Sequence, residues 1–479
     1  MPLACRTAYR REVKSNAAFF LLLTLCARGE ERKPNVLFII SDDMKAALGC
    51  QGNALARTPN LDKLAASGLL FDKAYCQFPL CNPSRVSMLT GRYPQATGVL
   101  GNRDDFRKGH PEWFTLPQWF KHHGYLTAKT GKVFHGGIDD PASWSANAME
   151  GVKLEKRPAQ TTWPLPGDDK LTKNGKSDRR IILEGNGDGH PENAVADRAI
   201  GFLRANSDTP FFLACGFVQP HSPPTAPRSF YDVHPAGDIP LPPDFAPRPT
   251  VPEGFPRASI RPRNADLFAG RDASEGEARE MIRAYHAGIS WMDWNAGRVL
   301  DELERLGLAD DTIVVFWSDH GYQLGEKGKW SKAGSLFEAG TRIPLIIRVP
   351  GGPPNGRCRR VVESIDLFPT LAKLCGLPLP PGLQGRDLGP LLENPAAAWE
   401  HPAFTIWSED GKGATGTSIR TEKWRYAEYA GGGALLLDPE ADPHETKNLA
   451  EDPEFAGVRA SLSAKITAFQ AARTGRSSD

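Results

Sequence analysis

Four short runs of almost entirely apolar residues constrain the fold of this chain most strongly. They are NVLFII (35–40), PFFLACGF (210–217), TIVVFW (312–317) and PLIIRV (344–349), each bounded by polar or turn-forming residues. Runs of this length that are apolar on both faces are typical of central strands in a sheet covered by helices. The four runs therefore predict a buried parallel or mixed sheet at the centre of the fold.

Helical patterns separate these runs and predict helices over 58–67, 116–124, 193–206 and 277–307. The longest segment spaces its apolar residues as one face of a helix does, and Gly307 provides a helix stop. Strands that alternate with helices predict an α/β layered fold.

A different pattern begins near residue 390. Short strand-like pieces are followed by a helix near 453–472; the pieces lie at 403–409, 416–421, 423–429 and 434–438. This predicts a catalytic domain over 33–389 and a smaller C-terminal α+β subdomain over 390–479. We expect the proline-rich residues 222–263 to wrap the surface as an insertion at the rim of the site.

The first 29 residues have the pattern of a secretory signal peptide. Four basic residues precede the apolar run AAFFLLLTLCA (17–27), which is too short to be a stable membrane span. The sequence predicts export to the periplasm or the medium. The alternative is a wrongly assigned start codon that precedes a fortuitous apolar patch.

Composition excludes several classes of protein. The chain has 58 lysines and arginines against 57 aspartates and glutamates, so no basic surplus favours nucleic acid binding. None of its eight cysteines forms a C-x-x-C motif, which argues against zinc ribbons and thioredoxin-like sites. We expect Cys50, Cys76, Cys215, Cys358 and Cys375 to be buried small residues, with one disulfide possible after export.

Ligand-type side chains follow two of the apolar runs. The first run leads into Asp42 and Asp43, and the third leads into Asp319 and His320. Open α/β sheets build their sites at the carboxyl ends of strands, and a hard cation is a natural reason to hold adjacent carboxylates together. A turn or a helix cap could explain either pair alone. Their recurrence predicts one shared metal site.

The stretch from Cys81 to Arg92 reads C-x-P-S-R-x-x-x-x-T-G-R. It resembles the signature of the type I sulfatases, whose cysteine is oxidised by a dedicated maturation enzyme to formylglycine. The resemblance extends from Asn35 to about Ala450 and is closest to iduronate-2-sulfatase and its bacterial relatives. It includes T-G-K-V-F-H (130–135), Q-P-H (219–221), S-D-H-G-Y-Q-L-G-E (318–326), G-K-W-S-K (328–332) and the segment 437–450.

The resemblance implies an alkaline-phosphatase-like mixed sheet flanked by helices and the hydrolysis of a sulfuric ester of a sulfated sugar. It also implies a calcium ion held by Asp42, Asp43, Asp319, His320 and the modified Cys81. Because calcium prefers oxygen ligands, we expect His320 to act partly through the bound sulfate.

The same resemblance implies the catalytic roles. Arg85 favours the ionised form of one hydroxyl of the aldehyde hydrate, and the second hydroxyl allows sulfate to leave. Lys132 and Lys332 stabilise the sulfate charge, and His221 protonates the leaving oxygen. His135 hydrogen-bonds the hydrate.

The specificity region is only partly similar to that of iduronate-2-sulfatase. Arg103 and Arg107 could pair with the carboxylate of a uronic acid, although two loop arginines are also commonly solvated. We interpret five other residues as structural: His122, His123, His286, His444 and Trp330.

Three other hypotheses remain open. A phosphonate or phosphate ester hydrolase of the same superfamily would use the same aldehyde and a divalent metal. A sulfated-glycan binding protein could have lost turnover. A host without the maturation enzyme would leave Cys81 a thiol and the protein inert.

Overall fold

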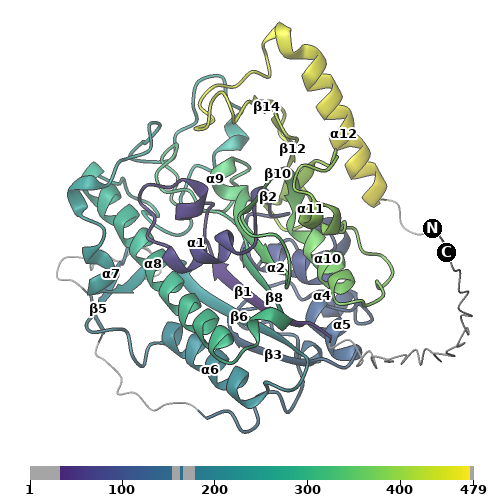
Figure 1. The fold of residues 1–479 in the computed structure, drawn as a ribbon. Coiled ribbons are helices and arrows are strands. Elements are labelled where there is room, and N and C mark those ends of the chain that lie inside the picture. Colours follow the sequence, from purple (N-terminus) through teal and green to yellow (C-terminus); the bar gives the residue numbers. More distant parts are fainter. Residues whose placement is uncertain (1–32, 154–161, 165–177, 475–479) are drawn as a thin grey trace, which may run out of the picture. The chain divides into compact units, whose positions relative to one another are not determined.

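The computed structural model describes residues 33–153, 162–164 and 178–474, and its centre is a seven-stranded sheet (Figure 1). The strand order is β10-β2-β9-β8-β1-β6-β3. Only β9 in this sheet runs antiparallel to its neighbours β8 and β2, so the predicted mixed central sheet is confirmed. The strands are β1 (Asn35–Asp42), β2 (Leu69–Tyr75), β3 (Leu126–Gly131), β6 (Phe211–Pro220), β8 (Thr312–Ser318), β9 (Arg342–Arg348) and β10 (Gly356–Glu363).

Helices cover both faces of this sheet. Because alternate strand residues point to opposite faces, each strand contributes side chains to both helix layers. Leu37 and Ile39 of β1 pack in a cluster with residues of α1 (Pro59–Ala66), α6 (Pro191–Ala205) and α8 (Glu275–Arg305). Their neighbours Val36, Phe38 and Ile40 pack in a second cluster with residues of α2 (Cys81–Thr90), α5 (Leu116–His122) and α10 (Leu367–Leu374). All eight residues of β1 are buried. The apolar runs of the sequence are apolar because both faces of the sheet are covered.

The four predicted helices are α1, α5, α6 and α8. The longest, α8, begins after Ser274, whose hydroxyl accepts from the backbone N–H of Glu277 in a capping box. Shorter helices complete the larger domain: α3 (Pro94–Thr97), α4 (Phe106–Gly109), α7 (Arg228–Asp232), α9 (Glu338–Thr341) and α11 (Gly389–Glu393). A small three-stranded sheet contains β4 (Thr162–Pro164), β5 (Ile181–Leu183) and β7 (Thr225–Pro227).

The C-terminal α+β subdomain is also present. Its antiparallel sheet comprises β11 (Ala403–Trp407), β12 (Gly416–Arg420), β13 (Arg425–Tyr429) and β14 (Ala434–Leu437), and α12 (Ala456–Thr474) follows. Leu462 and Ile466 of α12 pack on one face of that sheet. The other face packs against Phe78 and Phe337 of the larger domain. The boundary between 389 and 390 stays a prediction.

Two predictions about the chain's termini and cysteines have different outcomes. The predicted signal peptide over 1–29 lies outside the described residues, and no helix in the described part is long and apolar enough to cross a membrane. The six cysteines in the described part are all free thiols, so the possible disulfide does not form among them. Cys50 is half-buried and the other five are buried, close to what the sequence predicts.

Candidate active site at the ends of strands β1 and β8

The two acidic pairs predicted from the sequence come together because β1 and β8 are neighbours in the sheet. Ser41 pairs with Ser318, so Asp42-Asp43 and Asp319-His320 leave adjacent strands at the same level. The backbone N–H of Asp43 donates to Asp319 Oδ1 at 3.1 Å. Asp43 has a φ of 63°, a costly conformation for a residue with a side chain. The Tyr285 hydroxyl of α8 donates to the Asp43 carbonyl at 2.7 Å and holds this turn.

Cys81 is the first residue of the buried helix α2 and faces the acidic pairs. Its Sγ lies 3.4 Å from His320 Nε2 and 3.9 Å from Asp43 Oδ1. Pro83 fits here because the first turn of a helix needs no N–H donor to an earlier carbonyl. Gly91 ends the helix with a φ of 64°, which glycine adopts without strain. The motif from Cys81 to Arg92 therefore describes one short helix and its stop.

Arg85, one turn after Cys81, ties three parts of the site together. Its Nε donates to Asp319 Oδ2 at 2.9 Å and one terminal nitrogen donates to Asp42 Oδ1 at 3.0 Å. The other terminal nitrogen donates to the carbonyls of Lys132 and Val133, at 2.7 and 2.9 Å. The side chain is fully buried. Only a guanidinium offers donors in enough directions to make all four contacts.

Three further cationic groups surround the carboxylates. Lys132 Nζ pairs with Asp42 Oδ2. Lys332 Nζ lies 2.7 Å from Asp43 Oδ2 and 3.4 Å from His221 Nε2. His221 Nδ1 lies 2.7 Å from the carbonyl of Ser222, which fixes the ring and leaves Nε2 directed at the site. Two lysines and a histidine from three separate loops thus converge around the same carboxylates.

Burial and mutual charge shift the pKa values of these acids strongly. Burial raises the pKa of Asp43, and it raises that of Asp319 to about 7. Burial also opposes ionisation of Asp42, but Lys132 and Arg85 hold its pKa well below its ordinary value. Asp43 and Asp319 are thus the carboxyl groups whose charge the neighbouring cations compensate least.

The pKa values of the two histidines and of the Cys81 thiol shift so that the charged form of each is favoured. Burial disfavours the charged form of His221, yet Asp43 raises its pKa to about 9. Burial likewise opposes charge on His320, but Asp319 and Asp43 raise its pKa to about 10. Burial opposes ionisation of the Cys81 thiol, but Lys132, Lys332 and His320 together hold its pKa well below its ordinary value.

The residues present fit a divalent metal ion. Ligand atoms of Asp42, Cys81, Asp319 and His320 lie within 4.8 Å of one another, and so do those of Asp42, Asp43, Cys81 and His221. Three carboxylates buried side by side, two of them with raised pKa values, are the arrangement that a hard cation relieves.

Three predicted residues lie apart from this cluster. His135 follows Lys132 on the loop after β3; its Nδ1 is buried and lacks a hydrogen-bond partner in the described part of the chain. Arg107 is held by Asp140, with Nε to Oδ1 at 3.0 Å and a terminal nitrogen to Oδ2 at 2.8 Å. Arg103 is exposed and makes no ion pair with any residue the structure describes. The interpretation of Trp330 as packing is confirmed, since it is fully buried against Phe268.

Sequence reasoning missed three residues that position the site. Asp266 Oδ1 lies 3.6 Å from Lys332 Nζ. Glu192, buried at the start of α6, accepts from the backbone N–H groups of Val218 and Gln219 at 3.0 Å each and so holds the segment before His221. Tyr285 lies on the buried face of α8 and holds the Asp43 turn through its hydroxyl. Helical spacing signals burial of Tyr285, but no local pattern signals the partners of Asp266 or Glu192.

The chain is similar to known proteins over most of its length. The family model described as Sulfatase matches residues 34–377, and the model described as N-sulphoglucosamine sulphohydrolase, C-terminal, matches residues 325–472. The chain is 32% identical over 545 residues to Iduronate 2-sulfatase of Mus musculus, with 93% of this chain and 96% of that protein covered.

Two solved structures share the fold. A complex with the substrate D-glucosamine-2-N,6-O-disulfate superposes with a TM-score of 0.73 at 24% identity, covering 92% of this chain and 98% of that one. The phosphonate monoester hydrolase of Agrobacterium radiobacter gives a TM-score of 0.71 at 22% identity, with 92% and 96% covered. The predicted alkaline-phosphatase-like architecture is confirmed. With the family model spanning most of the larger domain, this chain belongs to the sulfatase family of sulfuric ester hydrolases.

Proposed function

We propose that this enzyme removes sulfate from a sulfated sugar, with a formylglycine made from Cys81 and a calcium ion held beside it. One observation carries the proposal: Cys81 begins a buried helix 3.4 Å from His320, inside a ring of cations and carboxylates. A simple buried cysteine would need none of these neighbours. A sugar is proposed because one relative is named Iduronate 2-sulfatase and a structure of the same fold holds a glucosamine disulfate as its substrate.

The hydrate of formylglycine, when present, would supply one hydroxyl that can attack sulfur and a second hydroxyl that allows sulfate to leave, and a bound calcium ion would supply positive charge. The other roles belong to side chains of this chain. Lys132 and Lys332, each paired with a carboxylate, are cations aimed at the centre where sulfate charge must be stabilised. The raised pKa of His221 favours its protonated form, and its Nε2 is directed at the same centre, which suits a proton donor to the leaving oxygen.

Asp42, Asp43 and Asp319 would hold the calcium ion, with the modified residue 81 and His320 beside it. His320 Nδ1 lies 2.9 Å from the carbonyl of Gly321, so this nitrogen carries the proton in the neutral ring. The Nε2 atom is then free to face the metal or the bound sulfate. His135, whose Nδ1 lacks a partner among the described residues, would hydrogen-bond the hydrate.

Burial of Cys81 supports a particular order of events. Its side chain is 1% exposed in the folded chain, so a maturation enzyme could reach it only before folding is complete. We propose that this step accompanies export directed by residues 1–29, whose sequence has the pattern of a signal peptide.

The proposal is tested by turnover of sulfate esters against matched phosphate and phosphonate esters, since the fold alone is shared with a phosphonate hydrolase. We expect faster turnover of the sulfated compounds, at least about tenfold loss of rate after chelation, and recovery with calcium. Cys81→Ala should abolish turnover while the fold survives. Faster phosphonate turnover would favour the rival hydrolase, and full activity of Cys81→Ala would exclude the mechanism.

A further inference from the structure

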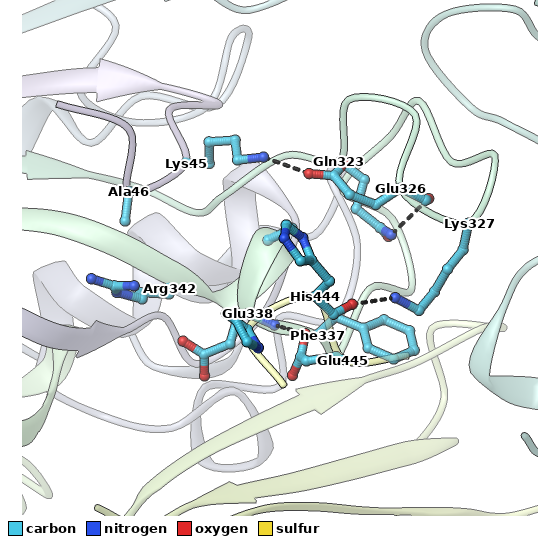
Figure 2. Close-up of a pocket in the computed structure, with 12 residues that line it drawn as sticks. Lys45, Ala46, Gln323, Glu326, Lys327, Phe337, Glu338, Arg342, His444 and Glu445 are labelled. Carbon is cyan, nitrogen blue, oxygen red and sulfur yellow. Dashed lines mark hydrogen bonds and ion pairs between the residues drawn. The ribbon is translucent and has the colours of Figure 1, made fainter. Parts of the chain in front are cut away.

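Three adjoining hollows lie where β2, β9 and β10 meet the C-terminal subdomain. The inner hollow, of about 210 Å³, is lined by Lys45, Lys327 and Arg342 and by the acidic Glu326, Glu338 and Glu445, so its charges balance. Figure 2 shows Lys45 and Arg342 on one side of it and Lys327, with its contact to the His444 carbonyl, on the other. Because Lys45 lies two residues after Asp43, this hollow begins beside the active-site turn.

The other two hollows continue from the inner one. The middle hollow, of about 330 Å³, shares Glu338 and Arg342 with the inner hollow. The outer hollow, of about 560 Å³, shares Lys73, Arg357 and Arg359 with the middle hollow. Together they form one groove, which we call the basic groove. It extends from the active-site turn to the β12–β13 turn at Lys423.

The local structure of β10 brings its arginines to the outer hollow. Successive strand residues normally point to opposite faces, but the register between β10 and β2 is interrupted between Cys358 and Val361. The irregularity lets the consecutive residues Arg359 and Arg360 line the same hollow, while Cys358 stays buried. β10 is an edge strand, and charge on an edge discourages pairing with other chains. Edge protection explains the presence of charge but not an excess of positive charge around one hollow.

The outer hollow carries a local excess of positive charge in a chain whose net charge is +1. Five basic side chains line it, namely Lys73, Arg357, Arg359, Arg360 and Lys423, against the acidic Glu422 and Glu440. Lys73 pairs with Glu440 at 2.8 Å, Arg360 pairs with Glu422 at 2.7 Å and Arg357 pairs with Asp72 at 3.3 Å, so three cations are neutralised.

Arg359 and Lys423 remain available to a ligand. Arg359 is exposed and makes no hydrogen bond or ion pair with the part of the chain that the structure describes. Lys423 is 61% exposed, and Asp438 lies 3.9 Å from its Nζ, at the limit of an ion pair. Exposed cations without firm partners cost little to redirect toward an anion.

The residues that line the basic groove favour one kind of polyanionic ligand over another. None of the described residues that line the middle or outer hollow is aromatic, whereas proteins that bind single-stranded nucleic acid provide aromatic rings for base stacking. A chain with anionic groups along an extended backbone needs only spaced cations and a groove. We propose that the basic groove binds a sulfated polysaccharide chain, so that the enzyme acts on long chains; this rests on the proposed function.

The test compares two double variants with equal changes of charge. Arg359→Glu with Lys423→Glu alters the groove, and Arg198→Glu with Lys465→Glu alters exposed residues on α6 and α12 outside it. Affinity for a heparin decasaccharide is measured by calorimetry at two salt concentrations, and turnover of an aryl sulfate is measured in parallel. We expect the groove variant to bind the decasaccharide about tenfold or more weakly, with a smaller salt dependence. Both variants should retain the aryl sulfate turnover of the wild type.

Equal affinity of the groove variant and the wild type would overturn the proposal, and so would an equal loss in the control variant. Tighter binding of a single-stranded oligonucleotide than of the decasaccharide at these residues would overturn the choice of ligand. The two proposals fail separately. A wild type that binds the decasaccharide through the groove but hydrolyses no sulfate ester refutes only the proposed function.

Discussion

Replacement of Arg85 by lysine tests how the active site is held together. Arg85 makes four contacts, two with carboxylates and two with backbone carbonyls, and it is fully buried. A lysine keeps the charge but places it on one atom, so it can retain one carboxylate contact and loses most of the others. Hydrogen bonds from a charged donor contribute about 1.5–3 kcal/mol each, and breaking a buried ion pair costs about 3–5 kcal/mol. We expect Arg85→Lys to lower the free energy of unfolding by about 3–5 kcal/mol.

Activity should fall further than stability alone explains. Arg85 holds the carbonyls of Lys132 and Val133, so its loss lets the Lys132 ammonium shift relative to Asp42. A displacement of about 1 Å at such a site costs about a hundredfold in rate. Denaturant unfolding and aryl sulfate turnover measure the two effects, at temperatures where the variant is folded.

Arg92→Lys is the matched control. Arg92 is also buried and donates to two backbone carbonyls, those of Thr90 and Pro381, but to no carboxylate within the described ranges. We expect this variant to lose some stability and keep its kcat/KM within about twofold. The reasoning is refuted if Arg85→Lys unfolds within about 1 kcal/mol of the wild type and turns over substrate at the same rate.

Three other predictions follow from particular contacts. Glu338→Gln should lower the free energy of unfolding by about 3–5 kcal/mol, because buried Arg420 and Arg425 lose their shared carboxylate. In the same denaturant unfolding experiment, Glu409→Gln at an exposed ion pair should cost about 1 kcal/mol or less. Burial raises the pKa of Glu192 to about 7, above its unfolded value of about 4.3. The protonated carboxyl therefore stabilises the folded state fully below a pH of about 4.3, and this contribution is lost as pH rises through about 7. Over that range the wild type should lose about 4 kcal/mol relative to Glu192→Gln, and a constant difference between the two unfolding curves would contradict this. Arg107→Ala should lower the free energy of unfolding by about 1.5–3 kcal/mol, because the ion pair with Asp140 is lost. Arg103→Ala should leave stability unchanged and raise KM only for substrates that carry a carboxylate. Thermal melting and kinetics of both variants measure the two effects.

The sheet was predictable where its strands are buried on both faces. Residues of β1, β6, β8 and β9 form continuous apolar runs, and their neighbours in the sheet explain why. The strands β2, β3 and β10 were not predicted, because each carries charged side chains: Asp72 and Lys73 in β2, Lys129 in β3, and three arginines in β10. Charge on edge strands and near the C-terminal subdomain hides the strand pattern.

The site was predictable where a local motif carries it. Asp42, Asp43, Asp319 and His320 were found because polar pairs at the ends of apolar runs are conspicuous, and Cys81 and Arg85 because their motif is long. The partners of Arg107 and Lys332 could not be predicted. Asp140 and Asp266 lie in irregular segments, and only the tertiary fold brings them to those side chains.

The mass of the tryptic peptide 74–85 tests the central claim most directly. This peptide contains both Cys76 and Cys81, so one spectrum holds the test and its control. After alkylation of the purified, active enzyme, we predict one alkyl group on Cys76, none on residue 81, and an aldehyde in place of the thiol at 81. A fully active preparation whose peptide carries two alkylated cysteines would contradict the account.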